Sequence, residues 1–228
     1  HNICDLSKKY SCEMIFISTD KAANPTSILG YTKRFAEKIC ENFNLSKLIK
    51  DKIKIVRFGN VFGSSGSAIN NFIDKINNEK PVQITNKKAT RYFMTVLEAC
   101  HLVLQTSEIN SNEKIFILNM GKPINIFELA SNLARIKIKI NQKYKFTYEE
   151  IGLFPGEKLK ETLIDKSEKI KKINKEIFAV ANKTEIVKNF DHLYKELNSY
   201  QLFPYMDVVF QLLCTGQTLS STTHQLQS

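Results

Sequence analysis

The stretch ISTDKAANPTSILGYTKRFAEK, from Ile17 to Lys38, decides the fold of this chain. It begins inside the short apolar run Met14–Ser18, which is typical of a strand buried in a parallel sheet. An Asn-Pro pair then breaks the chain, and Thr26 or Ser27 can cap a helix that we expect to reach about residue 44. A strand followed at once by a helix is the repeating unit of parallel α/β sheets.

Polar side chains are delivered to one edge of this predicted sheet. Thr19, Asp20 and Lys21 come just past the carboxyl end of the strand, and the helix returns Lys33 toward the same place. Open α/β sheets bind their ligands at that edge. An acid and a base placed there predict an enzyme, although a solvated Asp-Lys pair in a loop is the alternative for these two residues.

Strands and helices continue to alternate along the chain. Further strands are expected at Lys52–Phe58, Val82–Thr85, Arg91–Met94 and Lys114–Asn119, and further helices at Ala68–Asn78, Val96–Thr106 and Ile124–Ile136. From Tyr144 to Asn189 the pattern is choppier, with a strand in KFTYEE, the loop GLFPGEK and a final helix. The pattern predicts an α/β fold in which a parallel sheet carries a small lobe.

Composition restricts the function classes. The net charge of +10 comes almost entirely from Lys, whereas nucleic-acid readers usually cluster Arg with aromatic residues on one face. We expect the lysines to lie on polar helix faces, as in Lys169–Lys175, and we expect no nucleic-acid partner. The five cysteines are odd in number and lack metal or redox spacing, and the four histidines are scattered, so we expect no metal site and a reduced, cytoplasmic location.

Six motifs in order carry a resemblance to a known family. They are STDKAANPT, TKRFAEK, RFGNVFGSSGS, TRYFMT, NMGKP and PGEKL. Between Met14 and about Leu163 the chain resembles the extended branch of the short-chain dehydrogenase/reductase superfamily. Within that branch it is similar to the nucleotide-sugar 4,6-dehydratases of the CapD-like polysaccharide-biosynthesis family. The fold that this implies is a Rossmann-like sheet with a C-terminal substrate-binding lobe.

The resemblance implies a reaction on a UDP-N-acetylhexosamine with NADP or NAD as cofactor. A hydride leaves C4 of the sugar, a base removes the now acidic C5 proton, water leaves from C6, and the hydride returns to C6. In this resemblance Lys21 is the base, Asp20 the acid near C6, Thr19 stands beside them, and Lys33 holds the nicotinamide ribose. A base of this kind works best with a pKa near ambient pH.

The resemblance also implies contacts with the cofactor and the nucleotide sugar. It places Ser18, Phe58 and Asn60 with Lys33 beside the cofactor, and its substrate contacts are Asn60, Ser64, Ser67, Arg91, Glu157 and Lys158. The small residues of Gly63–Ser67 suit a diphosphate, because they let backbone N–H groups approach an anion. An ordinary glycine turn and, for Arg91, a surface ion pair are the alternatives.

One departure concerns the usual catalytic Tyr of the superfamily, which lies four residues before the Lys. This chain has Leu29 there, and Tyr31 lies about 200° away around the helix from that position. Longer, membrane-attached members often carry Met at this place. The resemblance therefore allows membrane attachment through a region upstream of residue 1, and it leaves open which group deprotonates the C4 hydroxyl.

A second departure is the absence of the Gly-rich dinucleotide turn, which should precede the first strand. We therefore expect residues 1–120 to form the later part of an NAD(P)-binding Rossmann-like domain with interleaved lobe segments, and residues 121–195 to form the substrate-binding lobe. Residues 196–228 change in composition and are expected to be a disordered or foreign tail, with a partner-binding helix as the alternative. Such a truncated sheet exposes an apolar edge.

The predicted function is a 4,6-dehydratase in surface-polysaccharide synthesis, present here as an inactive fragment of a protein that forms homo-oligomers when complete. A nucleotide-sugar 4-epimerase is the nearest alternative, and a non-catalytic interaction module on the same fold is another. The Asp20-Lys21 pair separates the first two, because epimerases normally lack this elimination acid and base.

Overall fold

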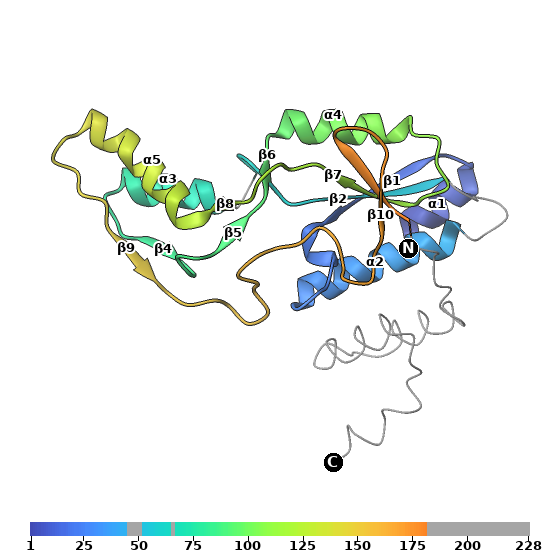
Figure 1. Ribbon diagram of the computed structural model, residues 1–228, viewed down its shortest axis with the longest axis horizontal. Helices are drawn as coiled ribbons and strands as arrows, with labels where there is room; N and C mark the ends of the chain where they lie inside the picture. The colour runs from blue at the N-terminus through green and yellow to red at the C-terminus, as the bar shows by residue number, and fades with distance from the viewer. Residues whose placement is uncertain (45–51, 65–66, 182–228) are drawn as a thin grey trace, which may run out of the picture.

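The computed structural model describes residues 1–44, 52–64 and 67–181. Figure 1 shows a sheet with helices at one end of the molecule and a smaller lobe at the other, joined by extended segments. The sheet has the strand order β1-β2-β7-β11-β10. Its strands are β1 (Met14–Thr19), β2 (Ile53–Phe58), β7 (Ile115–Leu118), β10 (Ile170–Lys172) and β11 (Ile177–Val180). The expected α/β fold with a parallel sheet is confirmed for β1, β2 and β7, which pair in parallel.

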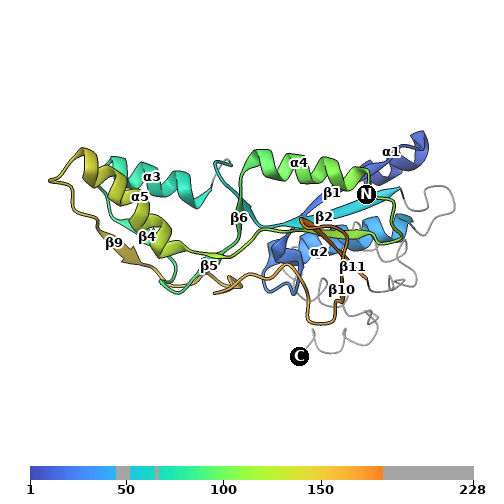
Figure 2. The same ribbon diagram turned by 45° about the horizontal axis from the view of Figure 1, so that its top comes forward.

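Helices cover both faces of the sheet, as Figures 1 and 2 show for α2 and α4. The helices of this part are α1 (Asn2–Tyr10), α2 (Ile28–Asn44) and α4 (Val96–Ser107). Neighbouring residues of β2 point to opposite faces, so Ile55 packs with Ile39 of α2, while Val56 packs with Leu102 of α4. Strand β1 pairs only with β2 among the described strands, and its Ile17 is 43% exposed, as expected for a sheet edge.

The lobe has a hydrophobic core of its own, built on two helices. These are α3 (Ala68–Asn77) and α5 (Ile126–Ile140), whose Phe72 and Ala130 are buried in that core. Short strand pairs complete the lobe and join it to the sheet: β3 (Asn60–Val61) with β6 (Phe93–Met94), β4 (Val82–Ile84) with β9 (Tyr148–Glu150), and β5 (Thr90–Arg91) with β8 (Ile124–Asn125). The lobe is therefore assembled from segments both before and after β7.

The stretch Lys169–Lys175 was expected on a helix face, and this expectation is wrong. It forms β10 and the turn of a hairpin, in which Asn174 caps the turn toward β11. Strand β11 pairs antiparallel with β7, which buries Ile177 completely. Residues 170–180 thus belong to the sheet, although the predicted division assigned them to the lobe. The physical reason is pairing with a distant strand, which outweighs local helical spacing.

Two further expectations concern the C-terminal part of the chain, much of which lies outside the described residues. The final helix expected before Asn189 does not occur up to residue 181, and residues 182–228, which include the expected tail 196–228, lie outside the described residues. Within the described ranges, no helix is both long and apolar enough to cross a membrane.

Candidate active site

The Asp20-Lys21 pair lies where β1 ends and a single 3₁₀ turn, η1 (Asp20–Ala22), begins. Thr19 caps this turn and donates a hydrogen bond to Asp20 Oδ1 over 2.8 Å. The Asp20 side chain is fully buried, and Lys21 Nζ lies 3.0 Å from the same Oδ1. The pair thus joins a buried carboxylate to an amine that reaches the pocket.

A loop from the lobe side, residues 152–158, is fastened onto the start of α2. Ser27 caps α2 through the Gly30 amide, Thr26 donates to the Gly156 carbonyl over 2.8 Å, and Lys158 Nζ donates to the Ala23 carbonyl over 2.9 Å. Gly156 has a φ of +75°, and a Cβ there would lie 2.4 Å from the Thr26 carbonyl oxygen. Only glycine therefore fits without strain at position 156, where the loop passes over Thr26.

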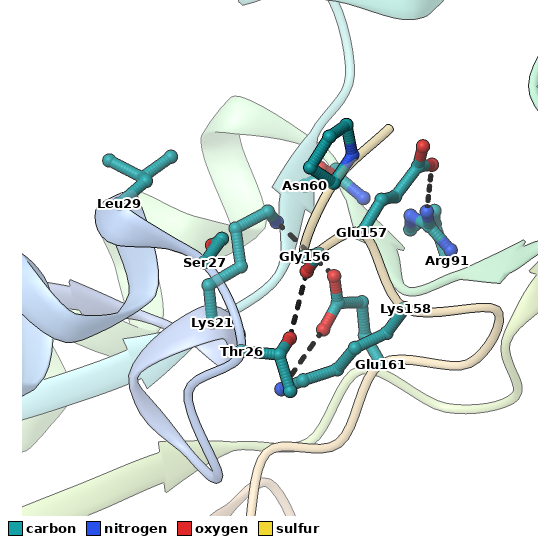
Figure 3. A pocket seen from close by; sticks show the side chains of 11 residues that line it. Lys21, Thr26, Ser27, Leu29, Asn60, Arg91, Gly156, Glu157, Lys158 and Glu161 are labelled. Carbon is teal, nitrogen blue, oxygen red and sulfur yellow. Dashed lines mark hydrogen bonds and ion pairs between the residues drawn. The ribbon is translucent and has the colours of Figure 1, made fainter. Parts of the chain in front are cut away.

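A pocket of about 340 Å³ opens between this loop and the carboxyl ends of the strands. Figure 3 shows side chains from the sheet end, the start of α2 and the lobe loop converging on it. Its lining residues are Lys21, Thr26, Ser27, Leu29, Asn60, Arg91, Pro155, Gly156, Glu157, Lys158 and Glu161. Five of them were predicted as site residues: Lys21, Asn60, Arg91, Glu157 and Lys158.

Charged groups dominate the pocket wall, and we call Lys21, Arg91, Glu157, Lys158 and Glu161 the pocket cluster. Arg91 forms an ion pair with Glu157, whose carboxylate also accepts hydrogen bonds from Thr85 and from the Phe154 amide. Arg91 thus lines the pocket and is held there by a largely buried ion pair. Cations on a concave wall are suited to a ligand with phosphate groups.

Several predicted site residues lie away from the pocket lining. Asp20 and Thr19 lie behind Lys21, and the Lys33 ammonium lies over the Phe16 ring, 5.8 Å from its centre. Ser64 is exposed, and Ser67 caps helix α3. The structure therefore brings the predicted acid and base together with the lobe residues, but it does not bring Ser64 or Ser67 to the same pocket.

Two predicted cofactor contacts are engaged inside the protein. The buried Ser18 hydroxyl donates to Glu37 Oε1, and Phe58 packs against a core cluster that contains Val56 and Met94. The Ser18 hydroxyl and the Phe58 ring are thus engaged within the protein. The sequence motif did not reveal this, because it does not show to which face of the strand each side chain points. Of the other two predicted cofactor contacts, Asn60 lines the pocket, whereas Lys33 lies on α2 with its ammonium over the Phe16 ring.

A second group of charges, which the sequence did not reveal, lies beneath the site. We call Arg34, Glu37, Arg57 and Glu168 the buried charge network. Both Arg57 and Glu37 are fully buried, and Arg57 donates to both oxygens of Glu37 and to Glu168 over 2.7 Å each. Arg34 bridges the same two carboxylates. The available signal was an Arg inside the apolar strand KIKIVRF, which requires a buried partner.

The pKa values in this network follow from its pairing. Burial raises the pKa of Glu37, but the hydrogen bonds and charge of Arg57, with the charge of Arg34, outweigh burial and hold it below its usual value. For Arg57, burial lowers the pKa, and its bonds to Glu37 and Glu168 outweigh this and raise it. Glu37 and Arg57 are therefore both charged at neutral pH.

The chain belongs to the family described as polysaccharide biosynthesis protein, which matches residues 1–183. It is 43% identical over 156 residues to the capsular polysaccharide biosynthesis protein CapD of Staphylococcus aureus, covering 68% of this chain and 26% of CapD. The chain thus spans about a quarter of the length of that curated relative. The family resemblance inferred from the six motifs is confirmed.

Solved structures show the same fold. One is Pen from Bacillus thuringiensis, which is 29% identical, with a TM-score of 0.70 and coverage of 78% of this chain and 55% of Pen. Another is a UDP-glucuronic acid 4-epimerase from Bacillus cereus in complex with NAD and a UDP-sugar analogue, which is 21% identical, with a TM-score of 0.60 and coverage of 73% and 57%. The second likeness concerns the fold alone.

Proposed function

We propose that this chain is the catalytic and substrate-binding part of an NAD(P)-dependent nucleotide-sugar 4,6-dehydratase that serves surface-polysaccharide synthesis. The observation that carries the proposal is the contact between Lys21 Nζ and the buried Asp20 carboxylate, 3.0 Å apart, at a pocket whose wall carries charged groups of both signs. An elimination needs a base and an acid at neighbouring carbons of one substrate, and this pair supplies both from consecutive residues.

The proton balance of this pair suits an elimination. When the shared proton lies on Asp20, the pair consists of a neutral amine and a carboxylic acid. Lys21 then takes the C5 proton, and Asp20 gives its proton to the departing C6 hydroxyl, which leaves as water. The pair returns to ammonium and carboxylate without any net gain of charge, so one turnover needs no outside acid or base at this step.

The pocket wall supports a nucleotide-sugar substrate. Arg91 and Lys158 offer cationic donors to the diphosphate, and Asn60 lines the same pocket. A bound NAD(P) would accept a hydride from C4 and return it to C6. On the cofactor side, Lys33 and Asn60 are the groups of this chain that we expect to hold and orient the nicotinamide end. The relative CapD, whose name refers to capsular polysaccharide, supports the biosynthetic role.

Leu29 favours a second candidate, a non-catalytic module on the same fold. It lines the pocket with 56% of its surface exposed, at the position where the superfamily usually carries its Tyr. An apolar side chain cannot remove the proton of the C4 hydroxyl. A 4-epimerase remains the third reading, because it shares the fold and the cofactor.

The deciding experiment supplies the protein, together with any coding sequence upstream of His1, with NAD(P) and UDP-N-acetylglucosamine. Mass spectrometry then follows deuterium uptake at C5 from heavy water and formation of the 4-keto-6-deoxy product. The proposal expects both, and it expects both to vanish in Lys21→Ala. A 4-epimer formed without loss of water would move the assignment to an epimerase. Absence of turnover on several UDP-sugars despite bound cofactor would favour the non-catalytic module.

A further inference from the structure

Glu161 places a second carboxylate beside Lys21. Its Oε1 lies 4.0 Å from Lys21 Nζ, and its Oε2 lies 3.6 Å from Lys158 Nζ. Figure 3 shows this carboxylate between the two lysines at the pocket wall. Its side chain is only 4% exposed, and Oε2 has no hydrogen-bond partner among the described residues. Burying a carboxylate oxygen without a hydrogen-bond partner costs folding free energy, so such a group calls for a functional explanation.

The surroundings of Glu161 separate it from an ordinary structural ion pair. Glu37 accepts short hydrogen bonds from Arg57 on both oxygens, whereas Glu161 contacts its two lysines only at ion-pair distances. Lys158 in turn donates to the Ala23 carbonyl, which fixes it near the end of η1. Glu161 therefore keeps its negative charge close to Lys21 without a tight partner.

We infer that Glu161 is a positioning residue for Lys21, which holds the Lys21 side chain toward the pocket and stabilises the ammonium that forms there. This inference rests on the proposed function. As Lys21 takes the C5 proton, the C5–H electron pair moves into the C5–C6 bond, the C6–O bond breaks, and the Asp20 proton completes the departing water. Positive charge thus develops on Lys21 during the step, and the Glu161 carboxylate, 4.0 Å away, stabilises that charge. Lys158 balances Glu161 while Lys21 is neutral.

The test compares the protein, with any upstream coding sequence, as wild type, Glu161→Gln, Glu161→Asp and Glu128→Gln. Glu128 is exposed on α5, so its variant makes the same chemical change far from the pocket. We expect Glu161→Gln to lower kcat about 10- to 100-fold, less than the loss of a base itself, with KM changed by less than about threefold. C5 deuterium uptake should fall by the same factor, the Asp variant should be intermediate, and Glu128→Gln should match wild type.

Other outcomes overturn the inference in distinguishable ways. An unchanged kcat in Glu161→Gln, or a raised KM at constant kcat, would show that Glu161 does not act through Lys21. A lowered unfolding temperature with proportionate loss of UDP-sugar binding would assign it a structural role only. If the Gln variant does not fold, a folded Glu161→Asp with undiminished kcat overturns the inference. A wild-type protein without dehydration or C5 exchange removes the proposed function, and the inference with it.

Discussion

The buried charge network and the pocket cluster use the same residue types in opposite ways. In the network, every carboxylate oxygen of Glu37 and Glu168 accepts a hydrogen bond, and three elements and a loop meet there. In the pocket cluster, Lys21 and Lys158 remain partly exposed, and one oxygen of Glu161 has no hydrogen-bond partner among the described residues. Satisfied charges hold a fold, whereas incompletely paired charges around a cavity are available to a ligand.

The difference also locates the two groups in the architecture. The network joins β1, α2 and β2 to the segment around Glu168, so it secures the return of the chain from the lobe to the sheet. Of the pocket cluster, Lys21 directly follows β1, whereas Arg91 lies on β5 and the other three residues come from the segment after β9. The first group can thus set the position of the second without contacting a ligand itself.

The largest effect is expected from Lys21→Met, which tests the pocket side of the comparison. It keeps the length of the side chain but removes the amine, and on the proposed function it should lower kcat about 10²- to 10⁴-fold. The free energy of unfolding should fall by less than in Arg57→Met, because Lys21 is partly exposed and the buried Asp20 carboxylate keeps its hydrogen bond from Thr19. Steady-state kinetics and urea unfolding measure the two quantities. A loss of unfolding free energy as large as the activation free energy that corresponds to the lost rate would erase the distinction between the pocket cluster and the buried charge network.

Arg57→Met tests the network side. The substitution leaves Glu37 and Glu168 buried without their main partner, and breaking such a pair costs about 3–5 kcal/mol of unfolding free energy. Urea unfolding followed by circular dichroism measures this, with Arg135→Met as the control, since Arg135 is exposed on α5. A loss below about 1 kcal/mol would contradict the structural role of the network.

The apolar runs of the sequence predicted the centre of the sheet, because β1, β2 and β7 need little beyond local hydrophobicity to be recognised. The hairpin β10–β11 was missed for a physical reason. Ile170, Ile173 and Ile177 recur at helical spacing, and only the pairing of Ile177 with Leu118 on β7 decides in favour of a strand. Long-range pairing of this kind leaves no local trace in one sequence.

The candidate site divides in a similar way. Motifs pointed to Lys21, Asn60, Arg91 and Lys158, and the fold brings these residues to one pocket. Ser18 was assigned to the cofactor, but its hydroxyl is turned inward to Glu37. Glu161 was passed over because PGEKLKE offers several charged residues, and the burial that distinguishes one of them arises only when the lobe loop packs on η1 and α2.

A smaller effect is expected at Gly156, where the lobe loop passes over Thr26 beside the pocket. Gly156→Ala places a Cβ against the Thr26 carbonyl at a φ of +75°, so the loop must shift or the residue must be strained by about 1–3 kcal/mol. We expect a raised KM for the nucleotide sugar and a lower unfolding free energy. Gly121→Ala is the matched control, because Gly121 has a φ of +65° with open space around its Cβ and does not line the pocket. Equal effects in the two variants would show that backbone strain alone, and not the contact with Thr26, is responsible.

Of these tests, acidification is expected to change stability least, and it separates the buried charge network from the pocket cluster most sharply. The pKa of Glu37 is lower in the folded than in the unfolded chain, so its contribution is complete above the ordinary value of 4.5 and is lost as the pH falls through the folded value. We expect the stability difference between wild type and Glu37→Gln to be constant from pH 7 to about pH 5 and to shrink below it. Urea unfolding at each pH measures the difference. A gap that stays constant down to pH 3 would mean that Glu37 is not held ionised by Arg57, and the network would then owe its stability to packing and not to paired charge.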